Sequence, residues 1–549
     1  MLLGMSSCSS KLGELTADNF YVSPNPLEAQ GGNVTAVIDG KFPEKYMKKK
    51  AVVEITPTLR ANDGSKTLTG SSVTFQGESV LGNNQTISYA NGGTYTMRSN
   101  FEYDDAIRNS SLYLTFNAKI GNKDVSESVP DVKIADGVVA TGELYRKLLS
   151  DGACYAPDSF QRVQEQKFEA QIKFLINQAQ LRKSELGSVS VTEFVEMLRQ
   201  INRDRETLAL KNIDVLAYAS PEGGFDYNDR LAGKRQDVTE KYVRQQLDKA
   251  DMDAEISGKY TAEDWEGFRQ LVEASNIQDK DVILRVLSMY KDPEERERQI
   301  RNMSEGFQEL ADGILPELRR SRLIINYEVV GRSDEQIKQQ LKEDASQLSA
   351  DELLYAATLE DDLANKQAIY TKAAEIYPTD SRIENNIAAV EIANGNYSAA
   401  QKYVNNVINA GDNSCTEAYV NKGIIALADG DIETAETNIS RCDGENANAA
   451  KGLLSIANGK YAAARSQLEG KNLNSTALAQ LLNGDYSSAQ RTLGSVENKN
   501  AMTDYLAAVV SARQGNNSEA SRCLRSAIGQ DGTLSAYAAD DIDLKDVSK

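Results

Sequence analysis

The sequence predicts a multidomain protein with an all-β sandwich, then an α/β domain, then an all-α solenoid of helical hairpins. Three observations predict this order. Short β-branched and aromatic stretches, separated by turn residues, fill the chain up to about residue 140. Strand-like alternation and helix-like periodicity then follow each other through the middle of the chain. In the last third, a Gly-x-x-x-x-Ala element recurs between apolar helices.

Length and charge limit the possible functions. With 549 residues, the chain is expected to form three or four domains. Its formal net charge of -20 argues against nucleic acid as a partner, because binding to phosphates depends on clustered lysine and arginine.

The chemistry-bearing residues argue against most enzyme classes. The chain has no histidine, which removes Ser-His-Asp and Cys-His nucleophile pairs and histidine-based metal sites. No two cysteines form a CxxC pair, so neither a zinc ribbon nor a disulfide framework is expected. We therefore predict no catalytic residue, no metal and no cofactor. The five cysteines are Cys8, Cys154, Cys415, Cys442 and Cys523.

The N-terminal stretch MLLGMSSCSS has features of a targeting signal. A short apolar run followed by small residues and Cys8 resembles the end of a bacterial lipoprotein signal over residues 1–8. The resemblance implies triacylation of Cys8 and stable anchoring in an outer membrane, facing the periplasm, with the cell surface as the other possibility. The alternative is a disordered N-terminus with a chance cysteine.

Residues 19–140 predict the β-sandwich. Stretches such as AVVEITPTLR and SSLYLTFNAKI are short and rich in β-branched and aromatic residues, with Gly, Asn and Asp turns between them. Regular strands at this spacing favour an immunoglobulin-like sandwich, although the Cys–Trp–Cys core of a true immunoglobulin domain is absent. Residues 141–164 are predicted to be a linker.

Residues 165–330 predict the α/β domain. The alternating stretch KFEAQIKFLI, the strand and helix of Asn212–Val238, and the final strand RLIINYEV give the order β-α-β-α-β. A helical insert from about Tyr260 to Leu310 interrupts this order and contains the only tryptophan, Trp265.

The sequence AYAS, followed by Gly223 and by NDRLAGKRQDV from Asn228, resembles the OmpA-like peptidoglycan-binding family. In that family an Arg and an Asp hold the zwitterionic end of diaminopimelate in the peptidoglycan stem. The resemblance places the Arg on Arg235 and the Asp on Ser220, which carries no charge.

Because Ser220 has no carboxylate, several interpretations of which loop residues bind the ligand remain open. Glu222 is the nearest substitute for it, and Asp226 and Asp229 are further candidates. Asn228 is a candidate ligand contact, or a residue that caps the helix. The alternative for Arg235 is a surface salt bridge.

Residues 349–540 predict the solenoid, after a linker helix over 331–348. The element reads GNYSAA, GDIETA, GKYAAA, GDYSSA and GNNSEA, with spacings of 35, 29, 25 and 31 residues between successive glycines. It resembles tetratricopeptide (TPR) helical hairpins, in which glycine permits the turn and alanine permits close helix packing. The resemblance implies a concave face that binds protein partners.

These features favour a non-catalytic outer-membrane lipoprotein scaffold. In this hypothesis the OmpA-like domain binds peptidoglycan and the TPR array binds envelope proteins, as in accessory subunits of secretion or assembly machines. An alternative is that the OmpA-like domain binds only proteins. A third hypothesis is an enzyme that acts on envelope polymers through the loop acids Glu222, Asp226 and Asp229.

Overall fold

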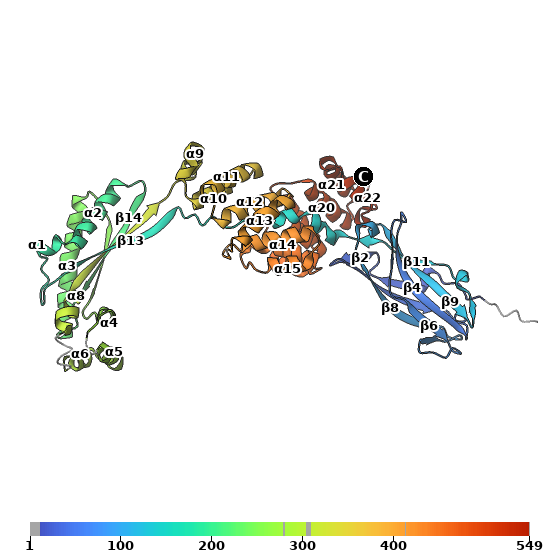
Figure 1. The fold of residues 1–549 in the computed structure, drawn as a ribbon, viewed down its shortest axis with the longest axis horizontal. Coiled ribbons are helices and arrows are strands. Elements are labelled where there is room, and N and C mark those ends of the chain that lie inside the picture. The colour runs from blue at the N-terminus through green and yellow to red at the C-terminus, as the bar shows by residue number, and fades with distance from the viewer. Residues whose placement is uncertain (1–10, 278–279, 303–308, 412, 548–549) are drawn as a thin grey trace, which may run out of the picture. The chain divides into compact units, whose positions relative to one another are not determined.

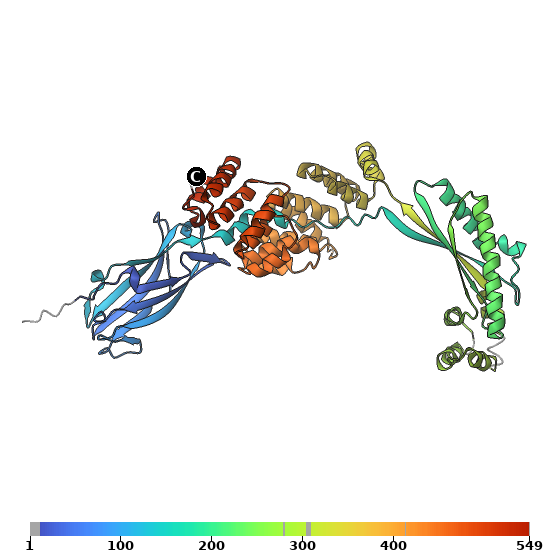
Figure 2. The ribbon, with the colours of Figure 1, turned by 180° about the vertical axis from the view of Figure 1, so that it is seen from behind.

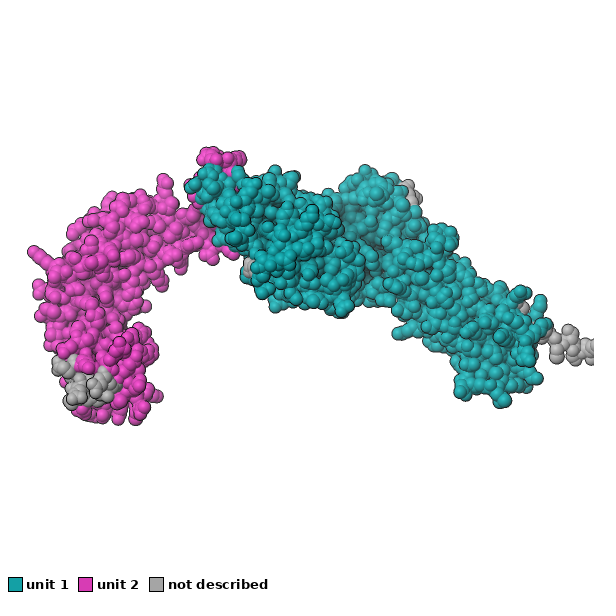
Figure 3. Space-filling model, in the orientation of Figure 1, with its two compact units in different colours: residues 1–158, 344–549 teal, residues 159–343 magenta. Residues whose placement is uncertain are grey.

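The computed structural model describes residues 11–277, 280–302, 309–411 and 413–547 (Figure 1). The chain forms two compact units, which Figure 3 shows in different colours. One unit combines residues 1–158 with 344–549, and the other is residues 159–343. Cys8 lies outside the described residues. Within the described residues, no helix is both long enough and apolar enough to cross a membrane.

The first unit begins with two β-sheets that face each other across an apolar core. One sheet has the order β1-β3-β2-β12 with β8 added to β3, and the other has the order β10-β9-β4-β6-β7 with β5 on β4 and β11 on β9. Buried and exposed residues alternate along the long strands, as expected when one face of a sheet packs on a core. The prediction of a β-rich N-terminal region is confirmed. The strands are β1 (Phe20–Ser23), β2 (Leu27–Gln30), β3 (Asn33–Phe42), β4 (Ala51–Ala61), β5 (Thr67–Thr69), β6 (Val73–Gly77), β7 (Gln85–Ile87), β8 (Gly93–Glu102), β9 (Ser110–Ile120), β10 (Lys123–Asp124), β11 (Val132–Asp136) and β12 (Val138–Val139).

The C-terminal part of the same unit is an array of antiparallel helical hairpins, seen from two sides in Figures 1 and 2. The prediction of helical repeats is confirmed. The helices are α10 (Ala350–Thr358), α11 (Leu363–Ile376), α12 (Ser381–Ala393), α13 (Tyr397–Asn409), α14 (Glu417–Ala428), α15 (Ile432–Ile439), α16 (Asn448–Ala457), α17 (Tyr461–Gln467), α18 (Asn474–Leu482), α19 (Tyr486–Ser495), α20 (Ala501–Arg513), α21 (Asn517–Gln530) and α22 (Leu534–Ala539).

The recurring glycine and alanine have the roles that their spacing predicts. Each glycine lies between the two helices of a hairpin with φ between +70° and +80°, a conformation that favours glycine. Each alanine, five residues later, is completely buried where the two helices pack together. The five pairs are Gly395 with Ala400, Gly430 with Ala435, Gly459 with Ala464, Gly484 with Ala489, and Gly515 with Ala520.

Most of the predicted linker, residues 141–158, is instead largely buried, and we call these residues the segment. Residues 141–152 form two 3₁₀ segments, Thr141–Lys147 and Leu149–Gly152, and the chain then runs extended to Asp158. Leu144 and Cys154 belong to the apolar core of the helical array. This difference arises because the segment has no helix or strand periodicity, although it supplies apolar side chains that the array buries.

The sandwich and the array are joined both directly and through this segment. Gln30, the last residue of β2, donates from Nε2 to the carbonyl oxygen of Gly459 at 2.9 Å. Arg513 of α20 forms an ion pair of 2.8 Å with Asp543, and its Nη2 also donates to Thr141 Oγ1. The sandwich, the segment and the array therefore form a single unit.

The second unit is a four-stranded sheet in the order β13-β16-β14-β15, with β14 and β15 parallel and the other pairs antiparallel. Side chains of α2 and α3 form one apolar core with those of the sheet. The elements are β13 (Val163–Lys173), α1 (Lys183–Leu186), α2 (Val189–Arg203), β14 (Leu208–Tyr218), α3 (Phe225–Lys249), β15 (Glu255–Thr261), α4 (Trp265–Ala274), α5 (Lys280–Met289), α6 (Pro293–Arg301), a π-helical turn (Leu310–Ile314), α8 (Leu315–Leu318), β16 (Arg320–Val330) and α9 (Asp334–Asp344).

The sequence-based order β-α-β-α-β omits β15. This strand lies at the edge of the sheet, is mostly exposed, and contains Gly258. Its weak alternation and its internal glycine explain why it was missed. The predicted start of the insert, about Tyr260, falls within β15. The helices of the insert begin after that strand, at Trp265, and have a separate small core that includes Phe268.

Candidate functional site

The loop between β14 and α3, where the OmpA-like resemblance predicts a ligand site, is held by contacts within the chain. Ser220 is 5% exposed and donates from Oγ to Glu222 Oε1 at 2.8 Å. The same carboxylate forms an ion pair of 2.6 Å with Arg319, which precedes β16. Glu222 is therefore already paired with a cation.

Arg235 lies inside the α/β unit and is only 1% exposed. Its Nε donates to the carbonyl oxygen of Gln178 at 3.0 Å, Nη1 to that of Tyr218 at 2.8 Å, and Nη2 to that of Leu175 at 3.2 Å. Its guanidinium carbon also lies 5.0 Å from the centre of the Phe174 ring. Arg235 thus joins the chain that follows β13 to the end of β14.

Burial has an electrostatic consequence for Arg235. Loss of solvent, together with the neighbouring positive charge of Arg319, lowers its pKa to about 10. The side chain remains charged at neutral pH, so its three carbonyl partners provide the compensation that a buried cation requires.

The side chain of Asn228 is also hydrogen-bonded within the loop. It is 2% exposed, and its Nδ2 donates to the carbonyl oxygens of Ser220 at 3.3 Å and Gly223 at 3.2 Å. The backbone N–H of Gly223 donates to Glu297 Oε1 of α6 at 2.7 Å. The backbone N–H of Gly223, just before α3, is therefore already bonded to a carboxylate of the helical insert. The structure brings Ser220, Glu222 and Asn228 into one hydrogen-bonded loop.

The remaining loop acids do not join this network in the same way. Asp226 is exposed on the first turn of α3, and Asp229 is half-buried one turn later. Of the three candidate acids, Glu222 is paired with a cation, Arg319, across the loop.

The helical array contains a second site, which the sequence did not reveal. The first helices of successive hairpins, α12, α14, α16 and α18, contact residues 141–152 or the extended chain that follows them. We call the surface formed by these four helices the groove. In both views the segment passes among the helices of the array (Figures 1 and 2).

Asparagine side chains hold the extended part of the segment by its backbone. Asn421 Oδ1 accepts the N–H of Cys154 at 2.9 Å, and Asn421 Nδ2 donates to the carbonyl oxygen of the same residue at 2.8 Å. Asn386 makes the equivalent pair of bonds with Ala156, at 2.7 Å and 3.1 Å. Both asparagines are at most 2% exposed. The bonded residues are two apart, which is the period of an extended chain.

Further contacts extend this pattern in both directions. Asn446 Nδ2 donates to the carbonyl oxygen of Tyr155 at 3.0 Å, and Arg382 Nη1 donates to that of Asp158 at 3.2 Å. The carboxylate of Asp151 accepts the N–H of Ser475 at 2.8 Å. Burial raises the pKa of Asp151, while this hydrogen bond opposes the rise. The groove therefore binds mainly backbone atoms of the segment.

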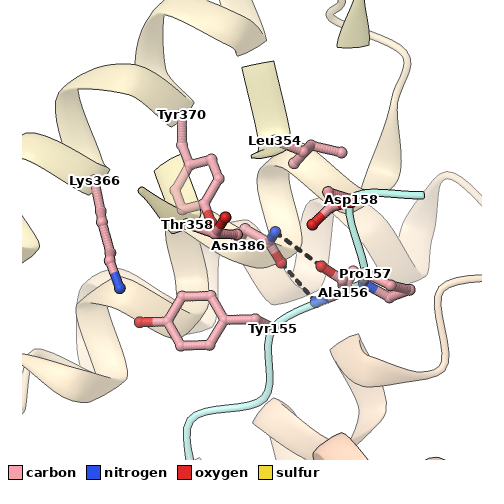
Figure 4. Close-up of a pocket in the computed structure, with 9 residues that line it drawn as sticks. All are labelled: Tyr155, Ala156, Pro157, Asp158, Leu354, Thr358, Lys366, Tyr370 and Asn386. Atoms are coloured by element: carbon pink, nitrogen blue, oxygen red, sulfur yellow. Dashed lines mark hydrogen bonds between the residues drawn. The ribbon is translucent and has the colours of Figure 1, made fainter. Parts of the chain in front are cut away.

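A cavity of about 320 Å³ lies where the segment leaves the groove. Figure 4 shows the Asn386 amide facing the backbone of Ala156, with Tyr155 and Lys366 on one side and Asp158 on the other. The Lys366 ammonium lies 6.0 Å from the centre of the Tyr155 ring. The cavity is lined by Tyr155, Ala156, Pro157, Asp158, Leu354, Thr358, Lys366, Tyr370 and Asn386.

No family model matches the sequence, and no curated protein matches it. Among solved structures, the chain is similar to a tetratricopeptide repeat protein from Parabacteroides merdae, with 16% identity over 36% of this chain and 85% of that chain, and a TM-score of 0.26. It is also similar to the APC/C hetero-tetramer Cut9-Hcn1, with 12% identity over 58% of this chain and 70% of that chain, and a TM-score of 0.30. TM-scores of this size do not define a shared fold.

The asparagines of the groove had a signal that sequence reasoning missed. Asn385 also donates from Nδ2 to the carbonyl oxygen of Cys154, at 3.1 Å. It is the fifth residue of α12, and Asn421 is the fifth residue of α14. Asparagine is an unfavourable residue in a helix interior, so its recurrence at equivalent positions of two hairpins indicates a polar role. Their shared partner, Cys154, however, lies more than 200 residues away in the sequence.

Proposed function

We propose that this protein is a non-catalytic scaffold of a bacterial outer membrane, with a lipid anchor on Cys8 and protein partners bound through its α/β unit. It would serve as an accessory subunit of a secretion or assembly machine. The burial of Arg235 against three backbone carbonyl oxygens is the main reason for proposing protein partners instead of peptidoglycan.

The loop chemistry supports this choice. A diaminopimelate end needs an exposed cation for its carboxylate and a carboxylate for its ammonium. Arg235 has no exposed face, and Ser220 supplies no charge. Glu222, the nearest acid, is neutralised by Arg319. The backbone N–H of Gly223 already donates a hydrogen bond to the carboxylate of Glu297 in the same chain.

The helical array supports a scaffold role in a different way. A helical-repeat array usually binds partners in its concave face. Here the groove is filled by residues 141–158 of the same chain, with backbone contacts at Cys154 and Ala156. The array would therefore hold the sandwich through this segment, and protein partners would bind the α/β unit instead of the groove.

The acids of the α3 loop support a non-catalytic role. Hydrolysis of an envelope polymer by carboxylates needs two acids on opposite sides of a cleft. Glu222 is paired with Arg319, and Asp226 projects from the first turn of α3 into solvent.

Peptidoglycan binding is the competing function, and it requires Arg235 to leave its carbonyl partners. The test is co-sedimentation of the full chain with isolated peptidoglycan, with and without free diaminopimelate as competitor. We expect no pelleting above that of an unrelated protein, with or without the competitor. Pelleting that diaminopimelate abolishes would establish wall binding and overturn the proposal.

The lipid anchor needs its own measurement. The mass of the N-terminal peptide from protein expressed with its native signal tests acylation of Cys8. We expect the mass of a triacylated cysteine. An unmodified Cys8 would remove the anchor from the proposal and leave the protein-binding role of the α/β unit standing.

A further inference from the structure

We propose that one end of the β-sandwich is a docking surface for an anionic lipid membrane, through a lysine cluster formed by Lys45, Lys48, Lys49 and Lys50. The inference rests on the proposed membrane location and adds to it a surface that contacts lipid headgroups directly. Three observations support it: the end of the sandwich at which the strands stop, the path of the N-terminal chain, and the positive charge of the lysine cluster.

Strand pairing places four connections at the same end of the sandwich. Phe42, the last residue of β3, pairs with Gly93, the first residue of β8. Ala51, the first residue of β4, pairs with Ile120, the last residue of β9. Strand β6 also ends here, because Gln76 of β6 pairs with Val52 near the start of β4. The connections that begin at residues 43, 78, 88 and 121 therefore lie together at this end of the sandwich. The helical array contacts the opposite end, at Gln30.

The N-terminal chain reaches the same end. Leu12 and Leu15 are buried in the sandwich core. A Cβ built on Gly13 would lie 3.2 Å from Cδ2 of Tyr46, a residue of the lysine-rich connection. Cys8 is three residues before the first described residue, Lys11, so the two Cα atoms are at most about 11 Å apart. An acylated Cys8 would therefore bring this end of the sandwich to the membrane.

The connection between β3 and β4, PEKYMKKK, contains four lysines and one glutamate in a chain whose net charge is -20. Lys45, Lys49 and Lys50 are exposed, and Lys48 is half-buried. In the described part of the chain, none of the four forms an ion pair. Their charges are therefore available to a partner.

The backbone that carries these lysines is fixed by its neighbours. The N–H of Lys45 donates to the carbonyl oxygen of Tyr89 at 2.7 Å, and the Lys48 ammonium lies 5.3 Å from the centre of the Tyr89 ring. The carbonyl oxygen of Lys49 accepts the N–H of Ser79 at 2.7 Å. The ordered loop reduces the entropy that the lysines lose on binding.

An apolar side chain lies on the neighbouring connection. Leu81, between β6 and β7, is fully exposed at 103%. A single exposed leucine is common on a protein surface. Here it accompanies the lysine cluster, and the combination suits a surface that meets headgroups with its cations and enters the acyl boundary with its leucine.

The test uses the unacylated full-length chain and sedimentation with lipid vesicles, so that acyl chains play no part. Neutral phosphatidylcholine vesicles are compared with vesicles in which roughly a third of the lipid is phosphatidylglycerol, in about 0.05 M and about 0.5 M salt. The variant is Lys49→Glu/Lys50→Glu. The matched control is Lys402→Glu/Lys499→Glu, which changes the net charge equally at exposed lysines of the helical array.

We expect binding to the anionic vesicles that falls in high salt, because each lysine near an anionic membrane contributes about fivefold in affinity. The Lys49→Glu/Lys50→Glu variant should lose at least about tenfold in affinity, and the control less than about twofold. Equal binding to neutral and anionic vesicles, no binding to either, or an equal loss in the control would overturn the proposal. Because the mass of the Cys8 peptide reports acylation separately, failure of the anchor and failure of this surface are distinguishable.

Discussion

At the scale of single residues, both sites depend on buried polar side chains that bond to backbone atoms. Arg235 joins three carbonyl oxygens in the α/β unit, and Asn386 and Asn421 each bond to both the N–H and the carbonyl oxygen of one residue of the segment. Removing such a side chain leaves its backbone partners buried without a hydrogen bond, which costs about 1–3 kcal/mol for each group.

The first prediction concerns Arg235. Arg235→Lys keeps the charge but cannot supply donors in three directions from a planar group, so the free energy of unfolding of the α/β unit should fall by about 2–4 kcal/mol. Denaturant unfolding of the full chain measures it. Arg230→Lys, an exposed position on the same helix, is the control and should change stability by less than about 0.5 kcal/mol. A change in Arg235→Lys as small as in the control would show that the carbonyl contacts contribute little.

The second prediction concerns Asp541, a buried acid at the end of the array. Burial, and then the charge of Asp543, raises its pKa to about 6, and Tyr505 Oη donates to its carboxylate at 2.6 Å. Because the pKa in the folded state lies above the ordinary value of 3.8 for an aspartate, the folded state binds the proton more tightly than the unfolded state does. This contribution to stability is therefore present at low pH and is lost as the pH rises through about 6.

Asp541→Asn should remove that dependence. Between about pH 5 and about pH 7.5, the wild type should lose about 1 kcal/mol more of its unfolding free energy than the variant. Chemical denaturation at the two pH values measures the difference, and Asp540→Asn, an exposed neighbour, is the control. An identical pH dependence in wild type and Asp541→Asn would contradict the assignment.

At the scale of elements, glycines set the hairpin turns, and one of them also contacts the sandwich. Gly430 and Gly459 have φ values of +80° and +70°. A Cβ on Gly430 would meet open space, whereas a Cβ on Gly459 would lie 2.6 Å from Cγ of Gln30 and 3.1 Å from the backbone nitrogen of Gly31. The two positions therefore separate backbone strain from the contact between sandwich and array.

The third prediction uses this pair. Gly430→Ala should cost about 1–2 kcal/mol through its left-handed backbone conformation alone. Gly459→Ala should cost more, because it also displaces the turn that holds Gln30. Thermal or denaturant unfolding of both variants makes the comparison. Equal losses would mean that the sandwich and the array do not depend on each other for stability at this point.

The sequence was informative where the pattern is local. The spacing of Gly395 and the later glycines predicted the hairpins, because a tight turn and a close helix contact need small residues nearby in the chain. It was uninformative where partners are distant. The contacts of Arg235 come from the chain after β13 and the end of β14, and the partner of Asn386 comes from residue 156. An edge strand such as β15, with few buried residues, gave too weak an alternation to detect.

At the scale of the whole molecule, residues 159–343 are inserted in sequence between the segment and the array that binds it. The extended part of the segment ends where this insertion begins, at Asp158 and Ser159. In this arrangement the groove is an internal joint of the scaffold, and partner binding falls to other surfaces.

Hydrogen exchange of the full chain, followed in peptides that cover residues 150–158, tests whether the segment is held in the groove. The N–H groups of Cys154 and Ala156 donate to buried asparagines, so these peptides should exchange as slowly as those of α14 and α16 in the core of the array. Asn421→Ala should accelerate exchange in this segment more than in those helices. Exchange of residues 150–158 within seconds in the wild type, as in an unstructured linker, would contradict the account.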